Sequence, residues 1–126
     1  MPRTTIAASS IITPLGPYPT LPVTALGLDL AWQAADPTNF NQFALGTGKF
    51  LILARNVHAS IGYTVTFTSI ADVPFKRSGD ITTYAIGFGK VLAFVLDQQA
   101  GWIQTDGMFY LTGSNASVEF CILRLP

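Results

Sequence analysis

The sequence predicts an all-β protein, an antiparallel β-sandwich or jelly roll of about eight short strands behind an extended proline-rich arm. Residues 63–68 (YTVTFT) alternate between an aromatic or branched face and a threonine face, which indicates a strand with one buried side. Turn residues separate further segments of this kind at short intervals. Residues 37–47 allow one short helical turn at most, because Asn, Thr and Gly are poor helix formers.

The first 22 residues differ in composition from the rest of the chain. They hold five of the eight prolines and a single charged side chain, Arg3. Proline fixes φ and lacks an N–H donor, so this stretch is expected to be extended and excluded from central strands. Residues 4–13 contain no proline, and they could join a sheet as an edge strand. We therefore divide the chain into an arm, residues 1–22, and a β-sandwich domain, residues 23–126.

The strands of the domain follow in order. Residues 26–34 carry alternating leucines and Trp32, and are interpreted as a strand. Residues 49–54 (KFLILA) and 90–96 (KVLAFVL) are continuous apolar runs, typical of strands covered on both faces. Asp106-Gly107 predicts a tight hairpin turn in which both central residues have positive φ. The remaining predicted strands are 81–86, 108–112 and 118–125, and the predicted core consists of Leu51, Leu53, Val65, Phe67, Phe94, Phe120 and Ile122.

Composition indicates a protein that associates with others. Hydrophobic residues make up 49% of the chain and charged residues 11%, and seven basic side chains balance seven acidic ones. Such a neutral surface offers little self-repulsion, so we expect an apolar surface that another subunit covers. The alternative is an ordinary monomer with a larger core. Nucleic acid is not an expected partner, because the basic residues are scattered. A membrane is not expected either, because the apolar runs reach only about six residues.

The residue inventory argues against an enzyme. His58 and Cys121 are the only histidine and cysteine, whereas zinc sites need three or four such ligands, so no metal or other cofactor is expected. A serine triad would have to use His58, and no G-x-S-x-G motif is present. Most acidic residues stand beside turn-forming residues. Asp29 and Glu119 lie within predicted strands and are expected to point outward or to pair with Arg124 or Arg55. A small carboxylate hydrolase is therefore the least favoured interpretation.

Aromatic side chains offer a further possibility. Trp102, Phe109 and Tyr110 flank the predicted hairpin and could stack on sugar rings if they were exposed. Given the overall hydrophobicity, core or subunit packing is the favoured role for them. An exposed aromatic row beside Asp or Asn would indicate a carbohydrate- or receptor-binding module instead.

Six segments, taken in order and at their spacing, carry a family resemblance. They are 35–37 (ADP), 48–56 (GKFLILARN), 64–67 (TVTF), 79–86 (GDITTYAI), 104–110 (QTDGMFY) and 121–125 (CILRL). This arrangement resembles small virion proteins of tailed phages, the β-sandwich or jelly-roll decoration (cement) proteins often encoded near the major capsid protein. The similarity spans roughly residues 26–125 and leaves the arm outside it. It implies a structural role on the capsid and brings no catalytic residues.

The expected function is therefore that of a non-enzymatic capsid decoration protein that forms homo-oligomers, such as a trimer, and stabilises the phage shell. Its expected partners are further copies of itself and the major capsid protein. It would be made in the host cytoplasm and located on the capsid surface. The alternative is a carbohydrate- or receptor-binding module of a tail or fibre. Ordering the arm costs conformational entropy that contacts must offset, and the residues expected to dock on a neighbour are Ile6, Ile11, Ile12, Tyr18 and Leu21.

Overall fold

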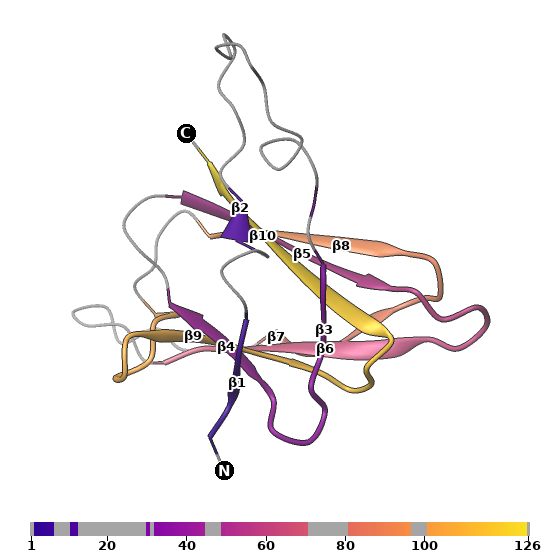
Figure 1. Cartoon of the computed structure of the whole chain (residues 1–126), viewed down its shortest axis with the longest axis horizontal. Coiled ribbons are helices and arrows are strands. Elements are labelled where there is room, and N and C mark those ends of the chain that lie inside the picture. The colour runs from indigo at the N-terminus through magenta and orange to yellow at the C-terminus, as the bar shows by residue number, and fades with distance from the viewer. Residues whose placement is uncertain are drawn as a thin grey trace, which may run out of the picture.

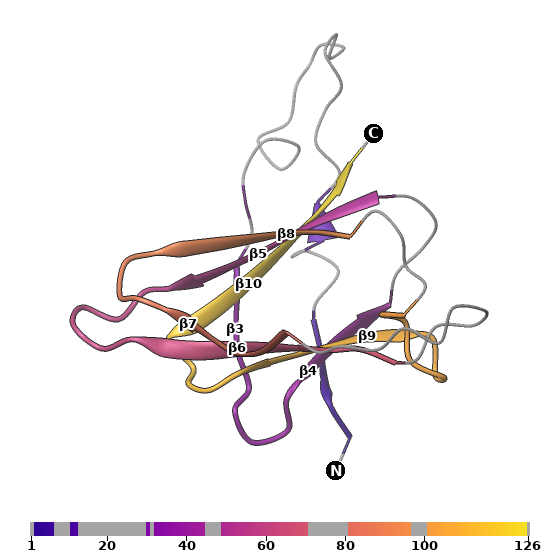
Figure 2. The same ribbon diagram turned by 180° about the vertical axis from the view of Figure 1, so that it is seen from behind.

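The described part of the chain consists of β-strands, turns and loops. The computed structural model describes residues 2–6, 11–12, 30, 32–44, 49–70, 81–96 and 101–125, with the backbone alone at 11–12 and 124–125. Within these residues there is no helix, so the predicted all-β class is confirmed. The strands form two sheets that lie one above the other (Figure 1), and the view from behind shows the same two layers (Figure 2).

The two sheets are mixed rather than purely antiparallel. In each sheet a two-residue strand from the N-terminal segment pairs in parallel, and the remaining pairs are antiparallel. The first sheet has the order β1 (Thr4–Thr5), β4 (Asn41–Ala44), β9 (Met108–Gly113), β6 (Tyr63–Thr68), β7 (Ile81–Ile86). The second has the order β2 (Ile11–Ile12), β10 (Val118–Leu125), β5 (Lys49–Asn56), β8 (Val91–Leu96), and β3 (Gln33–Ala34) also pairs with β10.

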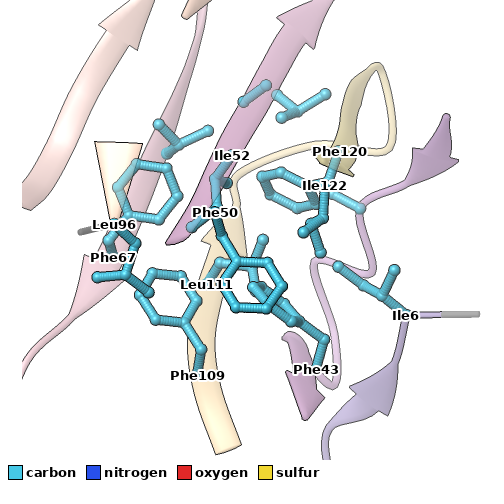
Figure 3. Packing of buried hydrophobic residues seen from close by; sticks show 14 of the residues in the cluster. Ile6, Phe43, Phe50, Ile52, Phe67, Leu96, Phe109, Leu111, Phe120 and Ile122 are labelled. Carbon is cyan, nitrogen blue, oxygen red and sulfur yellow. The ribbon is translucent and has the colours of Figure 1, made fainter. Parts of the chain in front are cut away.

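The core lies between the sheets and is rich in phenylalanine (Figure 3). Phe67 of the first sheet stacks on Phe94 of the second, with ring centroids 5.1 Å apart. Phe109 packs against Phe43 at 5.2 Å and against Phe67 at 5.9 Å. Of the predicted core residues, five lie in or against this cluster, which confirms them: Val65, Phe67, Phe94, Phe120 and Ile122.

The sequence prediction placed the wrong face of β5 in the core. Phe50, Ile52 and Ala54 face the core and are buried, whereas Leu51 and Leu53 lie on the opposite face and are only half-buried. A continuous apolar run does not reveal which of its two alternating faces turns inward, because both faces are hydrophobic. The structure therefore places two leucines on the outside of the second sheet.

The predicted hairpin at Asp106-Gly107 exists, with a different turn. The N–H of Gly107 donates to the carbonyl oxygen of Gln104 at 2.9 Å, and the N–H of Gln104 donates to that of Met108 at 2.8 Å. Gly107 has a φ of 82° and Asp106 does not have a positive φ. The loop is thus one residue longer than a two-residue hairpin and places only its glycine in the left-handed region.

Strand bounds agree with the sequence interpretation at several positions. Residues 63–68, 81–86 and 118–125 are strands over the predicted ranges. Strand β4 was not predicted, because its segment was interpreted as a short helical turn. Of the strand predicted at 26–34, only β3 is seen, and residues 26–29 and 31 lie outside the described residues.

Candidate assembly surface

Apolar side chains gather on the outer face of β5 and β8. Val91 and Val95 are 60% and 57% exposed on β8, and Ala93 between them is exposed as well. Val95 lies opposite Leu51 and Ala93 lies opposite Leu53 in the antiparallel pairing with β5. We call these five residues the β5–β8 strip. Their alternation follows from the strand period of two, because the intervening residues of both strands face the core.

Charged and aromatic groups bound the strip at one end. Arg55 lies opposite Val91 on β5 and forms an ion pair with Glu119 of β10, with Nη2 and Oε1 2.7 Å apart. The Arg55 guanidinium also lies over the ring of Trp32, 4.2 Å from its centroid. These contacts hold the arginine toward β10, so the strip itself carries no charge.

A second apolar group lies at the end of the molecule where β5 joins β6 and β7 joins β8, on the right in Figure 1. Phe88, Val57 and Ile61 are 54%, 51% and 49% exposed there. We call these three residues the apolar tip. In water each exposed apolar side chain is unfavourable, and these three lie on two neighbouring loops, which makes the tip a candidate contact with another protein.

Asn56 holds the two loops of the tip together. Its side chain is buried and its Nδ2 donates to the carbonyl oxygens of Ile61 at 2.8 Å and Ile86 at 3.0 Å. Its backbone N–H donates to the oxygen of Lys90 at 3.1 Å, and its own carbonyl oxygen accepts from Gly89 at 2.9 Å. A buried amide is stable only when such partners are present. The tip is therefore fixed to the sandwich rather than carried on a free loop.

His58 shapes the same loop. Its Nδ1 accepts hydrogen bonds from the backbone N–H groups of Ser60 at 3.1 Å and Ile61 at 3.0 Å. Its ring makes an edge contact with Tyr63, with centroids 5.7 Å apart. Nδ1 of His58 is thus engaged by the backbone of its own loop, and these bonds close the turn.

The described residues of the N-terminal segment, 2–6 and the backbone of 11–12, contact their own chain. Ile6 is buried in the core cluster (Figure 3), so the expectation that it docks on a neighbour is wrong. Thr4 and Ile6 donate their backbone N–H groups to the carbonyl oxygens of Phe40 and Gln42, both at 2.8 Å. Ile11 and Ile12 form β2 beside Ile122 and Leu123 of the same chain. Tyr18 and Leu21 lie outside the described residues.

Asp36 forms the hydrogen-bonded anchor of β1. Its carboxylate accepts from the Thr4 hydroxyl, from the backbone N–H groups of Thr38 and Asn39 at 3.0 Å, and from Nδ2 of Asn39 at 3.1 Å. These donors, the Thr4 hydroxyl first, lower the pKa of Asp36 to about 2, because they stabilise the charged form. The cluster is a structural clamp between β1 and the turn at 37–39.

The aromatic residues near the hairpin serve packing. Phe109 is buried and Trp102 packs against the core, 5.2 Å from Phe94 between ring centroids. Tyr110 lies on the outer face, but the guanidinium of Arg3 covers its ring at 4.0 Å from the centroid. The Tyr110 hydroxyl donates to Asp106 at 2.6 Å, and this bond lowers the pKa of Asp106 and raises that of Tyr110. One face of the Tyr110 ring is therefore occupied by Arg3 rather than free for a sugar.

The described residues contain no cluster of three or more His, Cys, Asp or Glu side chains placed to bind a metal ion. Cys121 is buried in β10 between two core residues. Within the same described ranges, no helix is long and apolar enough to cross a membrane.

Comparisons of the chain with protein-family models, with curated proteins and with solved structures found no match. The strip and the tip are the candidate functional residues of the described chain, and the docking of Ile11, Ile12, Tyr18 and Leu21 stays a prediction. The signal for the strip was present in the sequence, because every residue from Val91 to Leu96 is apolar. The tip had no such signal, since Val57, Ile61 and Phe88 are isolated apolar residues in loops.

Proposed function

We propose that this chain is a non-enzymatic structural protein of a virion, a capsid decoration (cement) protein of a tailed phage. In this role the domain is a jelly-roll type β-sandwich with a proline-rich N-terminal segment, and it stabilises the shell as a homo-oligomer bound to the major capsid protein. The resemblance of residues 26–125 to such proteins supports the proposal. Its place in the particle is the capsid surface.

The observation that carries the proposal is the distribution of apolar surface. Only 11% of the residues are charged, and the described chain exposes apolar side chains in the β5–β8 strip and the apolar tip instead of burying them. Exposed apolar side chains that gather on one face or on neighbouring loops are typical of contacts between proteins, so both surfaces support a role in an assembly.

We assign the contact with the shell to the apolar tip. The tip is held by the Asn56 hydrogen bonds, so little loop entropy is lost when it binds. It also lies at the end of the sandwich, where it can reach a flat surface without disturbing either sheet (Figure 2). Phe88 is exposed, and phenylalanine is among the residues that are enriched at the centres of protein interfaces.

The test is binding of the purified chain to phage shells that lack it, measured by co-sedimentation. The natural chain should saturate the shells at a fixed ratio to the capsid protein. Phe88→Ser should weaken binding at least about tenfold. Tyr84→Ser is the matched control, because Tyr84 is an aromatic of similar exposure (51%) on β7, outside the tip. Absence of saturable binding by the natural chain would contradict the proposed function.

A further inference from the structure

β8 is a terminal strand with an unusually open edge. Among the described residues no strand pairs with the side of β8 that faces away from β5. Its six residues pair with β5 from Val91 to Leu96 without any register shift, and none of them is charged or a proline. Edge strands normally carry a charge, a proline or a bulge that prevents pairing with another chain. β8 has none of these three protections.

The other described edges are protected. β7, the end of the first sheet, has a register shift in its pairing with β6, and Thr83 within it has a φ of 49°. This irregularity twists the edge and interrupts the row of backbone groups that a further strand would need. β1 and β2 are two residues long each and present too short an edge. β8 is therefore the one long and regular free edge that the described strands provide.

The hydrogen-bond pattern shows which groups face the open side. The N–H of Asn56 donates to the carbonyl oxygen of Lys90, which makes this pair a hydrogen-bonded pair of the β5–β8 ladder. Hydrogen-bonded pairs alternate along an antiparallel ladder, so Leu92, Phe94 and Leu96 bond to β5. The N–H and C=O groups of Val91, Ala93 and Val95 then point to the open edge. The same three residues carry the exposed apolar side chains.

We propose that β8 pairs antiparallel with β8 of a second copy of this chain, about a two-fold axis at Ala93. In this register Val91 lies opposite Val95 of the second copy, Ala93 lies opposite Ala93, and Leu92 lies opposite Phe94. The three residues with outward backbone groups form hydrogen-bonded pairs, and the outer face gains apolar cross-strand contacts. The second sheets of the two copies join into one continuous sheet, which extends the β5–β8 strip across the axis.

A second copy fits this edge better than an unrelated strand. The strand is its own complement about Ala93, because apolar residues of similar size oppose each other and no like charges meet. Contacts about a two-fold axis use the same patch on both chains, and this edge meets that condition. The inference rests on the proposed function for the biological need to oligomerise. Such a contact closes at two copies, and the expected trimer would require a different contact.

The test is the association of the full chain in solution, by sedimentation equilibrium without any shell present. The natural chain should dimerise, and Val95→Lys should raise the dimer dissociation constant at least about tenfold by placing a charge against Val91 of the other copy. Tyr84→Lys is the matched control. It introduces the same charge at an apolar residue of similar exposure (51%) on β7, outside the strip and the tip, and should leave dimerisation unchanged.

A charge pair tests the register itself. Val91→Glu alone should weaken the dimer like Val95→Lys, but the double variant V91E/V95K should restore it to within about threefold of the natural chain. Only a register centred on Ala93 places position 91 opposite position 95. High salt should remove most of this rescue, because the new pairs are exposed at the surface. Circular dichroism of each variant establishes that the strands are retained.

A natural chain that remains monomeric up to about 1 mM would overturn the inference. It would also be overturned by an undisturbed dimer in Val95→Lys, or by a double variant no tighter than the single ones. These results separate from the proposed function. A monomer that still saturates phage shells would refute the β8 contact alone, and a β8 dimer that binds no shell would refute the proposed function alone.

Discussion

The hydrogen bonds of the Asp36 carboxylate lead to a first prediction, on how the stability of the fold depends on pH. The pKa of Asp36 is about 2, below its ordinary value of 3.8, chiefly because the Thr4 hydroxyl donates to it. A carboxyl whose pKa is lower in the folded state stabilises the fold above its ordinary pKa, and this contribution disappears as the pH falls toward 2. Melting temperature should therefore drop between pH 4 and pH 2, and Asp36→Asn should flatten that part of the profile.

Thr4→Val provides the sharper check on the same clamp. It removes the largest cause of the shift while retaining the size of the side chain, so the pKa of Asp36 should move up toward 3.8. A carboxyl-carbon NMR titration measures this directly. A titration of Asp36 near its ordinary value in the natural chain would contradict the hydrogen-bonded clamp.

The buried residues of a strand could be predicted from the sequence where polar residues alternate with apolar ones. The threonines of β6 mark its outer face, so Val65 and Phe67 were placed in the core correctly. β5 has no polar residue between Phe50 and Ala54 to mark a face, and Leu51 and Leu53 were placed on the wrong side. The outer face of β5 is apolar as well, so the sequence does not show which face turns inward. The same outer face forms part of the β5–β8 strip.

At the level of the elements, β1 leads to a second prediction, on the stability of the fold. It is only two residues long, but it ends beside the buried Ile6 and pairs with β4. Ile6→Ala should lower the free energy of unfolding by about 2–4 kcal/mol, because it opens a cavity in the core. Thr5→Ala is the control, since Thr5 is exposed, and should change stability by less than about 0.5 kcal/mol. Urea denaturation measures both.

Removal of the whole element extends this test. Deleting residues 2–6 should destabilise the protein by more than Ile6→Ala does, because the β1–β4 pairing and the Asp36 clamp are lost as well. A truncated chain as stable as the natural one would show that the N-terminal segment is a detachable arm. The sequence predicted such an arm from its prolines. It could not reveal that the short stretch before Ala7 contributes a core residue.

Element prediction was otherwise limited by short polar strands. β4 was missed because Asn is typical of turns, and only the burial of Asn41 and Phe43 shows the alternation of a strand. The long strands were found because they are rich in branched and aromatic residues. The loops that form the apolar tip could not be predicted, because the hydrogen bonds of Asn56 connect residues that are about 30 positions apart in the chain.

At the scale of the whole molecule, the low net charge and the exposed apolar surface both favour association with other chains. A chain with seven charges of each sign lacks the self-repulsion that keeps small proteins apart. Its described surface adds an open apolar strand edge and an apolar tip. Composition alone predicts an associating surface. It could not place that surface, because strand order and loop contacts depend on pairing between distant segments.

We propose that the chain is a structural component of a virion shell, and its copy number in phage particles tests this proposal. Particles of the phage that encodes this chain should be purified and their proteins quantified by mass spectrometry. We expect this chain in the intact particle, in a fixed and high ratio to the major capsid protein, and retained after empty shells are separated from tails. Particles that lack the chain, or that carry it only in the tail fraction at a few copies, would contradict a structural role in the shell.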